Sequence, residues 1–301
     1  MSAPVPMLGE ACALLSGLAW SASLILFRRV EGISAVGLNV FKNVGATALM
    51  GVTLLLLGHS LSPDRTLAHW LTLALSGLLG ITVADYLFFK ALGTLGPARL
   101  AVVECTYAPA VIIMAALVLN EPVPPTLALG GGLVAAGMLV VTTGAHPPST
   151  RAAEERPWLG ALYGASALLI MALAIVIARP VFRAEPDASL VEISFVRLVA
   201  GTVGQFALIL PSATLRRELG VLRPGPHWKL LVPATILGAW LSALLWLGGF
   251  FYAAAGTAAV LNQTTTVFTL LLARAFLAEP LTPRRMLGVA LGVTGAWVVL
   301  V

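Results

Sequence analysis

The chain has 301 residues, of which 59% are hydrophobic and only 10% are charged, and its formal net charge is +5. Soluble domains average about 45–50% apolar and about 25% charged residues, so this composition excludes a soluble enzyme. The basic residues are scattered singly or in pairs without a basic stripe, which argues against nucleic acid as a partner and favours a negatively charged lipid surface.

Ten apolar segments follow one another along the chain, each bounded by charge, Pro or Gly. A helix needs about 20 mostly apolar residues to cross the hydrocarbon core, and the strand-like alternation of a membrane barrel is absent. We therefore predict an all-α integral membrane protein with ten transmembrane helices. The expected spans are Leu8–Phe27, Gly37–Leu57, Trp70–Leu92, Arg99–Leu119, Thr126–Thr143, Trp158–Ala178, Ala188–Leu210, Leu230–Tyr252, Thr257–Leu277 and Met286–Val301.

The first segment is interpreted as a permanent span rather than an export signal. Residues 1–7 contain no Lys or Arg, and no cleavage site of small residues follows Phe27. Cys12 and Cys105 both fall inside apolar segments, so we interpret them as small core residues. We expect no disulfide, no metal site and no cofactor.

The longest polar connection divides the chain into two halves of five spans. The predicted organisation is a first repeat over residues 8–143, a polar linker over residues 144–157 and a second repeat over residues 158–301. Because five is an odd number, homologous halves would insert into the membrane in opposite directions.

Sequence matches between the halves support a duplication. The turn Leu119-Asn120-Glu121-Pro122 recurs 158 residues later as Leu277-Ala278-Glu279-Pro280, and a later Pro and two glycines keep the same register. Shorter matches need other offsets, and they pair Phe41-Lys42 with Val196-Arg197, Arg28 with Arg179, and Phe88-Phe89 with Phe250-Phe251. Leu79-Gly80 fits Leu237-Gly238 at a further offset, which leaves the register of the third span open.

Two five-helix halves, each with a Leu-x-Glu-Pro turn before a Gly-rich last helix, resemble the EamA-type transporters of the drug/metabolite transporter superfamily. The family's Trp-Gly-Ser in the first helix is matched only in part, by Trp20-Ser21-Ala22. The resemblance implies an inverted-repeat secondary transporter with a central cavity, which usually exports small metabolites. We accordingly expect a monomeric, multi-pass protein of the cell (inner) membrane, and the resemblance names no substrate.

The orientation in the membrane is predicted in two conflicting ways. Basic residues outside the spans number three on the face of the termini, against eleven on the opposite face, and the positive-inside rule would place the eleven in the cytoplasm. The family resemblance instead implies cytoplasmic termini. The three are Arg65, Arg179 and Arg183, and the eleven are Arg28, Arg29, Arg99, Arg151, Arg156, Arg216, Arg217, Arg223, Lys229, Arg284 and Arg285.

Glu104 is the leading candidate for a substrate site, because an ionisable residue inside a span is costly and marks function. Tyr107 follows at a same-face spacing, and the Glu-Pro register matches Glu104 with Asn262 and Cys105 with Gln263. We predict that Glu104, Tyr107, Asn262 and Gln263 bind substrate where the two repeats meet. The alternative is an interhelical hydrogen bond that only joins helices.

Lys42 and Arg197 are also related by the repeat, each one to two turns into its span. They either bind an anionic group of the substrate, with Asn43 as a neutral donor beside Lys42, or extend towards the lipid headgroups or pair with other residues. Trp20 is a candidate to stack on substrate, although ordinary packing is the commoner role of a single Trp such as Trp20, Trp240 or Trp246.

Glu104 and Asp85 are the candidate proton carriers, because burial disfavours the charged form of a carboxylate. An ion pair between Asp85 and Lys42, within one half, is the equally supported alternative for Asp85. Glu10, Glu192 and Arg274 are near span ends and are expected to be interfacial anchors. The run Thr264-Thr265-Thr266 is expected to bond back to its own helix.

The leading functional hypothesis is a secondary transporter that exports a small polar or zwitterionic, amino-acid-like metabolite by alternating access. The alternative is a proton-coupled multidrug or nucleoside exporter, so protons are a candidate partner besides the small-molecule substrate and the lipid bilayer. An intramembrane enzyme is a remote alternative, because no HExxH zinc helix or other membrane-enzyme motif is present. The short loops and the absence of a Walker A motif argue against a subunit of an ATP-driven importer.

Overall fold

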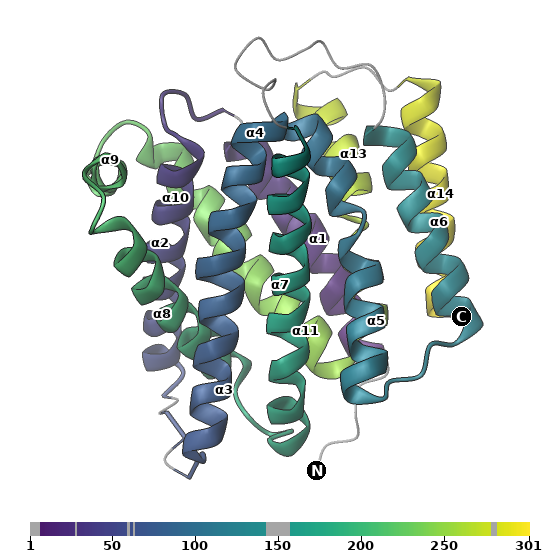
Figure 1. The fold of residues 1–301 in the computed structure, drawn as a ribbon, viewed down its shortest axis with the longest axis horizontal. Coiled ribbons are helices and arrows are strands. Elements are labelled where there is room, and N and C mark those ends of the chain that lie inside the picture. Colours follow the sequence, from purple (N-terminus) through teal and green to yellow (C-terminus); the bar gives the residue numbers. More distant parts are fainter. Residues whose placement is uncertain (1–6, 28, 59–60, 63, 143–156, 278–281) are drawn as a thin grey trace.

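The computed structural model describes residues 7–27, 29–58, 61–62, 64–142, 157–277 and 282–301, and within these ranges all regular elements are helical. Short helices and turns join longer helices into one bundle (Figure 1). The helices are α1 (Leu8–Phe27), α2 (Ala35–Leu56), α3 (Leu67–Gly77), η1 (Leu78–Ala84), α4 (Asp85–Glu104), α5 (Tyr107–Leu119), α6 (Pro125–Thr142), α7 (Pro157–Ala184), α8 (Leu190–Ile209), α9 (Ala213–Arg216), η2 (Arg217–Leu222), α10 (Trp228–Thr235), η3 (Ile236–Leu241), α11 (Ser242–Tyr252), α12 (Ala255–Asn262), α13 (Thr265–Leu277) and α14 (Pro283–Leu300).

Several of these helices have the length and composition of a membrane span. Six qualify among the described residues, and two shorter apolar helices, Tyr107–Leu119 and Pro125–Val140, accompany them. This confirms a helical, multi-pass membrane protein, whereas the total of ten transmembrane helices stays a prediction. The six are Leu8–Phe27, Val36–Leu56, Leu67–Phe88, Trp158–Ala184, Leu190–Ile209 and Trp228–Tyr252.

The structure differs from the sequence prediction at one connection between predicted spans. A loop was expected between Leu92 and Arg99, but α4 is helical from Asp85 to Glu104, and the chain leaves the helix only at residues 105 and 106. A helical turn keeps its backbone groups hydrogen-bonded within the chain, which is the cheaper solution near hydrocarbon. The predicted linker before Pro157, the turn Glu279-Pro280 and Arg28 lie outside the described residues.

The second half repeats the helix boundaries of the first. The π-helical segments η1 and η3 begin 158 residues apart, at Leu78 and Ile236. The same spacing relates α5 to α13 and α6 to α14 at both of their ends. One register therefore holds from η1 to the end of each half, which favours the match of Leu79-Gly80 with Leu237-Gly238.

The earlier helices of each half keep a second spacing. Ser34 and Ser189, which are 155 residues apart, cap α2 and α8, and each side chain accepts a hydrogen bond from the backbone N–H three residues on. Such caps satisfy one of the N–H groups that a helix start leaves without a partner. The 155-residue offset that pairs Lys42 with Arg197 in the sequence is therefore also the offset of the two helix starts.

The two halves run in opposite directions through the bundle. Figure 1 shows α1 leaving the lower end of the bundle, whereas α7 descends to that end. We call this lower end, where α1 begins and α14 ends, the terminal face. The first helix of each half packs on helices of the other half. Helix α1 packs on α11 and α13, and α7 packs on their counterparts α4 and α5.

The last helices of the two halves, α6 and α14, form the most extensive helix pair in the bundle. Gly130 and Gly295 face each other there, and a Cβ atom added to either would come within 2.6 Å of the other's carbonyl oxygen. Small residues of this kind allow two membrane helices to approach closely.

Candidate functional site

Each half contains one interrupted helix, and the two interruptions are equivalent. The first separates α4 from α5 at Cys105 and Thr106, and the second separates α12 from α13 at Gln263 and Thr264, again 158 residues later. Inside a membrane such interruptions are tolerated only where protein or a cavity surrounds the backbone. They therefore mark the position at which both halves depart from regular structure.

Threonine hydroxyls stabilise both interruptions in the same way. The Thr106 hydroxyl donates to the Val103 carbonyl at 2.7 Å, and the Thr264 hydroxyl donates to the Leu261 carbonyl at 2.6 Å. The same two carbonyls also accept the backbone N–H of Thr106 and of Thr264, so each threonine closes a tight turn with both its hydroxyl and its N–H. The predicted back-bonding of the threonine run is confirmed at Thr264, whereas Thr106 was not singled out from the sequence.

The two interruptions touch each other through Gln263. Its side-chain Nε2 donates to the backbone carbonyl oxygen of Glu104 at 3.1 Å. Two residues that the repeat register placed at one level are thus brought into contact across the interface of the halves. The contact uses the Glu104 backbone, so the Glu104 carboxylate has neither a hydrogen bond nor an ion pair within the part of the chain that the structure describes.

Further polar groups beside the interruptions are buried without a partner. Tyr107 is 7% exposed and Asn262 is 8% exposed, and neither the Tyr107 hydroxyl nor the Asn262 side-chain nitrogen has a hydrogen-bond partner among the described residues. A buried polar group without a partner costs about 1–3 kcal/mol. A site with several such groups is suited to a ligand that supplies the missing bonds.

Arg197 projects from α8 into the same core. It is 6% exposed, its guanidinium carbon is 5.5 Å from the centre of the Trp246 ring, and it interacts electrostatically with Tyr107. Its Nε has no hydrogen-bond partner, and no ion pair of Arg197 is found within the described ranges. Tyr107 belongs to an apolar cluster and Trp246 packs against it, so the Arg197 cation contacts an apolar, aromatic surface.

Lys42, the repeat partner of Arg197, has a different environment. Its Nζ is 3.6 Å from an Asp85 carboxylate oxygen and 5.7 Å from the centre of the Trp20 ring. Asn43 is 2% exposed and donates to the Gln205 side chain at 3.2 Å. The Lys42–Asp85 ion pair weighed in the sequence analysis is therefore present. The contact of Asn43 with Gln205 was not predicted.

The predicted site residues thus form two groups. Glu104, Tyr107, Asn262, Gln263 and Arg197 lie around the helix interruptions, where three of them retain buried polar atoms without partners. The second group is linked by contacts of its own and consists of Trp20, Lys42, Asn43 and Asp85. Their roles in substrate binding and proton coupling stay predictions.

A small pocket adjoins the interruption of the second half. Gln263 lines it together with residues of α6, α13 and α14, and its space of about 10 Å³ matches a single water molecule. In this conformation the bundle is closely packed on that side of Gln263.

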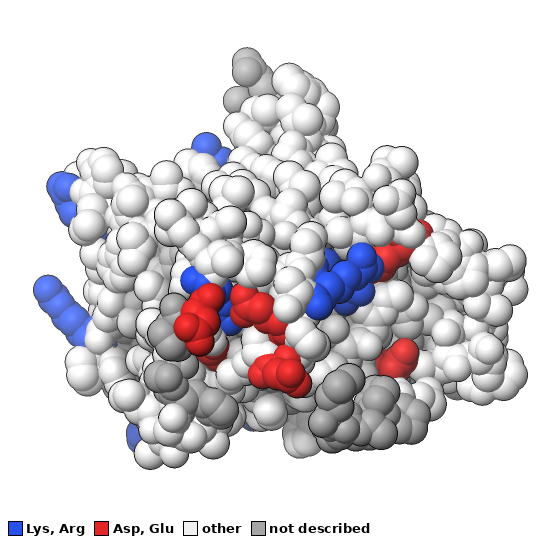
Figure 2. All heavy atoms as spheres, turned by 90° about the horizontal axis from the view of Figure 1, so that it is seen from below, with Lys and Arg blue, Asp and Glu red and all other residues white. Residues whose placement is uncertain are grey.

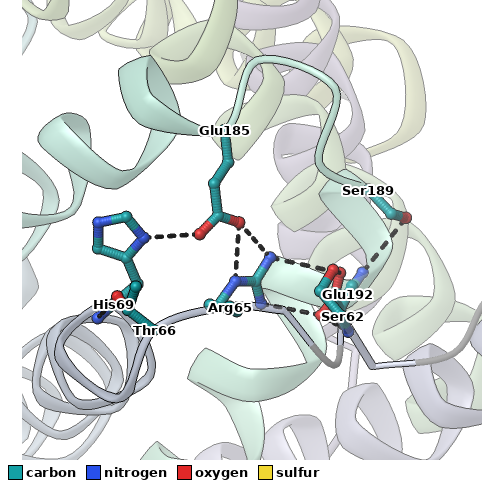
Figure 3. Close-up of polar contacts among 7 residues, drawn as sticks. All are labelled: Ser62, Arg65, Thr66, His69, Glu185, Ser189 and Glu192. Carbon is teal, nitrogen blue, oxygen red and sulfur yellow. Dashed lines mark hydrogen bonds and ion pairs between the residues drawn. The ribbon is translucent and has the colours of Figure 1, made fainter.

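A cluster of charged residues at the terminal face joins the two halves. Arg65 precedes α3 and binds Glu192 of α8 at 2.9 Å and Glu185, at the end of α7, at 2.8 Å (Figure 3). His69 also contacts Glu185, at 2.7 Å. The interpretation of Glu192 as an interfacial anchor was wrong, because its side chain is 2% exposed and holds the completely buried Arg65.

A second charged cluster on this face is centred on Glu121, in the turn between α5 and α6. Its carboxylate binds Arg179 at 2.8 Å and Arg183 at 2.6 Å, and it accepts from the backbone N–H of Ala255 at 2.8 Å. Figure 2, which views the terminal face, shows acidic and basic side chains gathered near its centre. The Glu-Pro motif therefore supplies a carboxylate that contacts the other half, a role its turn position did not reveal.

The fold and these contacts define a polytopic helical membrane protein of two equivalent halves that meet at a polar interruption. The sequence profile of the EamA-like transporter family matches residues 7–143 and 158–301. The chain belongs to that family and is a membrane transporter of the drug/metabolite transporter superfamily, as the resemblance implied.

Comparison with curated proteins and solved structures shows a shared fold and identifies no substrate. No curated protein matches the chain. A solved structure described only as "Crystal structure of protein" is 19% identical, with a TM-score of 0.79 over 96% of this chain and 95% of the other. At that identity the likeness shows a shared fold alone.

Proposed function

We propose that this protein is a secondary transporter of the inner membrane that exports a small zwitterionic, amino-acid-like metabolite by alternating access. It would act as a monomer with ten transmembrane helices in two inverted repeats, over residues 8–143 and 158–301. The opposite courses of α1 and α7 support this arrangement (Figure 1). A transporter of this kind needs a site between its halves that each face of the membrane reaches in turn.

The observation that carries the proposal is the set of buried polar groups without partners around the helix interruptions. Arg197 is a cation, and the Tyr107 hydroxyl and the Asn262 amide are donors, which together suit a carboxylate. The Glu104 carboxylate suits an ammonium group. A zwitterion would thus supply a partner for both charges, each of which is costly to bury alone.

Proton coupling is the more specific alternative, and it would operate through Glu104 or Asp85. The Lys42–Asp85 ion pair supports Glu104 as the first candidate, because Asp85 already has a cation beside it. A facilitator driven only by the substrate gradient would need neither residue as a proton carrier. Transport into liposomes with and without an imposed pH gradient separates these two cases.

The experiment that tests the proposal is counterflow into proteoliposomes with the twenty amino acids as a panel. Nucleosides and cationic dyes form the comparison set, since they represent the alternative exporter. We expect exchange of at least one amino acid and loss of that exchange in Glu104→Gln, with the variant folded in detergent. Exchange of nucleosides or dyes alone, or undiminished exchange by Glu104→Gln, would contradict the proposed substrate class and site.

The control is Arg274→Gln, which removes an exposed charge from α13 while leaving the interruption unchanged. It should transport as the parent does. A loss of transport in this control would point to general damage rather than to the site.

A further inference from the structure

The ion pairs that join the two halves are gathered at one end of the bundle. Among the described residues, Arg65 pairs with Glu185 and Glu192, and Glu121 pairs with Arg179 and Arg183. These residues belong to helix ends and turns at the terminal face (Figure 1). The first cluster joins the connection between α2 and α3 to the end of α7 and the first turn of α8. The second joins the turn between α5 and α6 to α7.

The central ion pair of each cluster is closed to solvent although both clusters lie at the end of the bundle. The Arg65 side chain is 0% exposed and Glu192 is 2% exposed, while Arg179 is 7% and Glu121 is 8% exposed. Arg179 also donates to the backbone carbonyls of Phe250 and Ala253, which belong to the end of α11. Arg65 and Glu121 of the first half thus hold the ends of α7, α8 and α12, and Arg179 joins the end of α11 to α7.

Among the residues that the structure describes, two contacts between the halves at the opposite face are of a different kind. There Ser34, before α2, bonds to Glu218 of η2, and Arg29 donates to the Phe276 carbonyl at 2.9 Å. Both are hydrogen bonds of exposed groups. Exposed contacts contribute little, because water competes for them and side-chain entropy opposes them.

We propose that the two charged clusters are the latch that holds the terminal face of the transporter closed, and that each transport cycle breaks and remakes it. The inference rests on the proposed alternating-access function. We call the Arg65 cluster and the Glu121 cluster together the latch. The structure is then the conformer in which the substrate site is shut from the terminal face.

The position of the latch makes it reversible. Buried charges without partners are strongly unfavourable, so the latch resists partial opening. Water reaches the same charges once the halves separate at this end, so the fully open state rehydrates them. An ion pair near the middle of the bilayer would lack that compensation. Charged clusters at a water-facing end therefore suit a two-state closure better than an apolar seam.

The test measures how fast a thiol at the substrate site is labelled from each side of the membrane. Cys105 lies in the first helix interruption, beside Glu104, and is 8% exposed. In a Cys12→Ala chain it is the sole cysteine, because the sequence contains two. A membrane-impermeant maleimide is applied to intact cells and, separately, to inside-out vesicles.

The side that corresponds to the terminal face is found with a separate reporter. Val301 at the C-terminus is 75% exposed, so Val301→Cys in a chain with Cys12→Ala and Cys105→Ala reacts only where that face is accessible. No assumption about the orientation in the membrane is then needed.

The latch variants are Glu121→Gln and Glu185→Gln, and the second is the milder because Glu185 is 20% exposed. We expect Cys105 labelling from the terminal face to rise at least about tenfold, because removal of a closing contact shifts the population toward the open state. Glu218→Gln is the matched control, since it removes a carboxylate that joins the halves at the opposite face. It should not raise labelling from the terminal face.

Unchanged labelling in well-folded latch variants, or an equal rise from both sides, would overturn the latch. Each variant is first checked for a single sharp peak in size-exclusion chromatography, so that unfolding is not mistaken for opening. Because labelling needs no substrate, the result is independent of the counterflow experiment. Absence of counterflow with one-sided labelling would refute the proposed substrate and leave the latch intact.

Discussion

The side chain of Gln263 donates a hydrogen bond to the backbone carbonyl of Glu104 at 3.1 Å, which joins the interrupted helix of one half to that of the other. The two residues come from helices that the 158-residue repeat makes equivalent. A glutamate at this level in one half and an amide pair in the other make the arrangement asymmetric. In the proposed transporter, this asymmetry would allow the site to distinguish the two ends of a zwitterion.

Gln263→Leu should lower the free energy of unfolding by about 1 kcal/mol, because the Glu104 carbonyl loses its side-chain donor. The matched variant is Asn262→Leu, whose side-chain nitrogen has no partner among the described residues. Asn262→Leu removes a buried nitrogen without a hydrogen-bond partner. It should therefore lower the free energy of unfolding by less than Gln263→Leu does, or raise it. Unfolding of both variants in a detergent titration measures the difference, and equal destabilisation would contradict the assigned contact.

Gly130→Ala should destabilise the pairing of α6 with α14 by about 1–3 kcal/mol, the usual cost of overpacking. Its new Cβ would come within 2.6 Å of the Gly295 carbonyl oxygen, and backbone cannot easily move away. Gly132→Ala is the control on the same helix, where an added Cβ meets nothing within 4 Å. Thermal denaturation should separate the two variants, and a similar loss in Gly132→Ala would contradict the assigned contact, because helix propensity favours Ala over Gly at both positions.

Arg65→Gln should be among the most damaging single substitutions at the terminal face. Glu192 is 2% exposed and would lose its cation, and breaking a buried pair in this way costs about 3–5 kcal/mol. Arg183→Gln removes a cation from the same face that is 52% exposed, and its expected cost is at most about 1 kcal/mol. Comparable stability of the two variants would mean that water already screens the Arg65 cluster.

The sequence predicted which residues lie at the level of the helix interruptions better than it predicted their contacts. The Glu-Pro register correctly placed Glu104 and Gln263 at one level, because a fixed offset survives wherever no residues are inserted between two landmarks. The different contacts of Lys42 and Arg197 could not be predicted, because they depend on whether an acidic residue of another helix lies within reach of each side chain. Lys42 has Asp85 there, and the described surroundings of Arg197 offer Trp246 instead.

The two charged clusters at the terminal face could not be predicted from the sequence for a related reason. Arg65 and Glu192 are 127 residues apart and belong to different halves, so no local pattern links them. Arg65 was interpreted only as a basic residue outside the spans, and Glu192 only as an anchor near a span end. Proximity of span ends on one face follows from topology, but which charges meet there depends on how the bundle packs.

The Lys42–Asp85 ion pair gives a last prediction, which a double-mutant cycle can test. The two side chains are 20% and 17% exposed, so water reaches the pair in part and reduces its strength. Lys42→Met leaves Asp85 without its cation, and Asp85→Asn leaves Lys42 without its anion, so each single variant should destabilise the fold. The double variant removes both charges and should be less damaging than the sum, with a coupling energy of about 0.5–3 kcal/mol. The measurement is unfolding in detergent for all four chains. Strict additivity would show that the two charges do not interact, and Asp85 would then regain equal standing with Glu104 as a proton carrier.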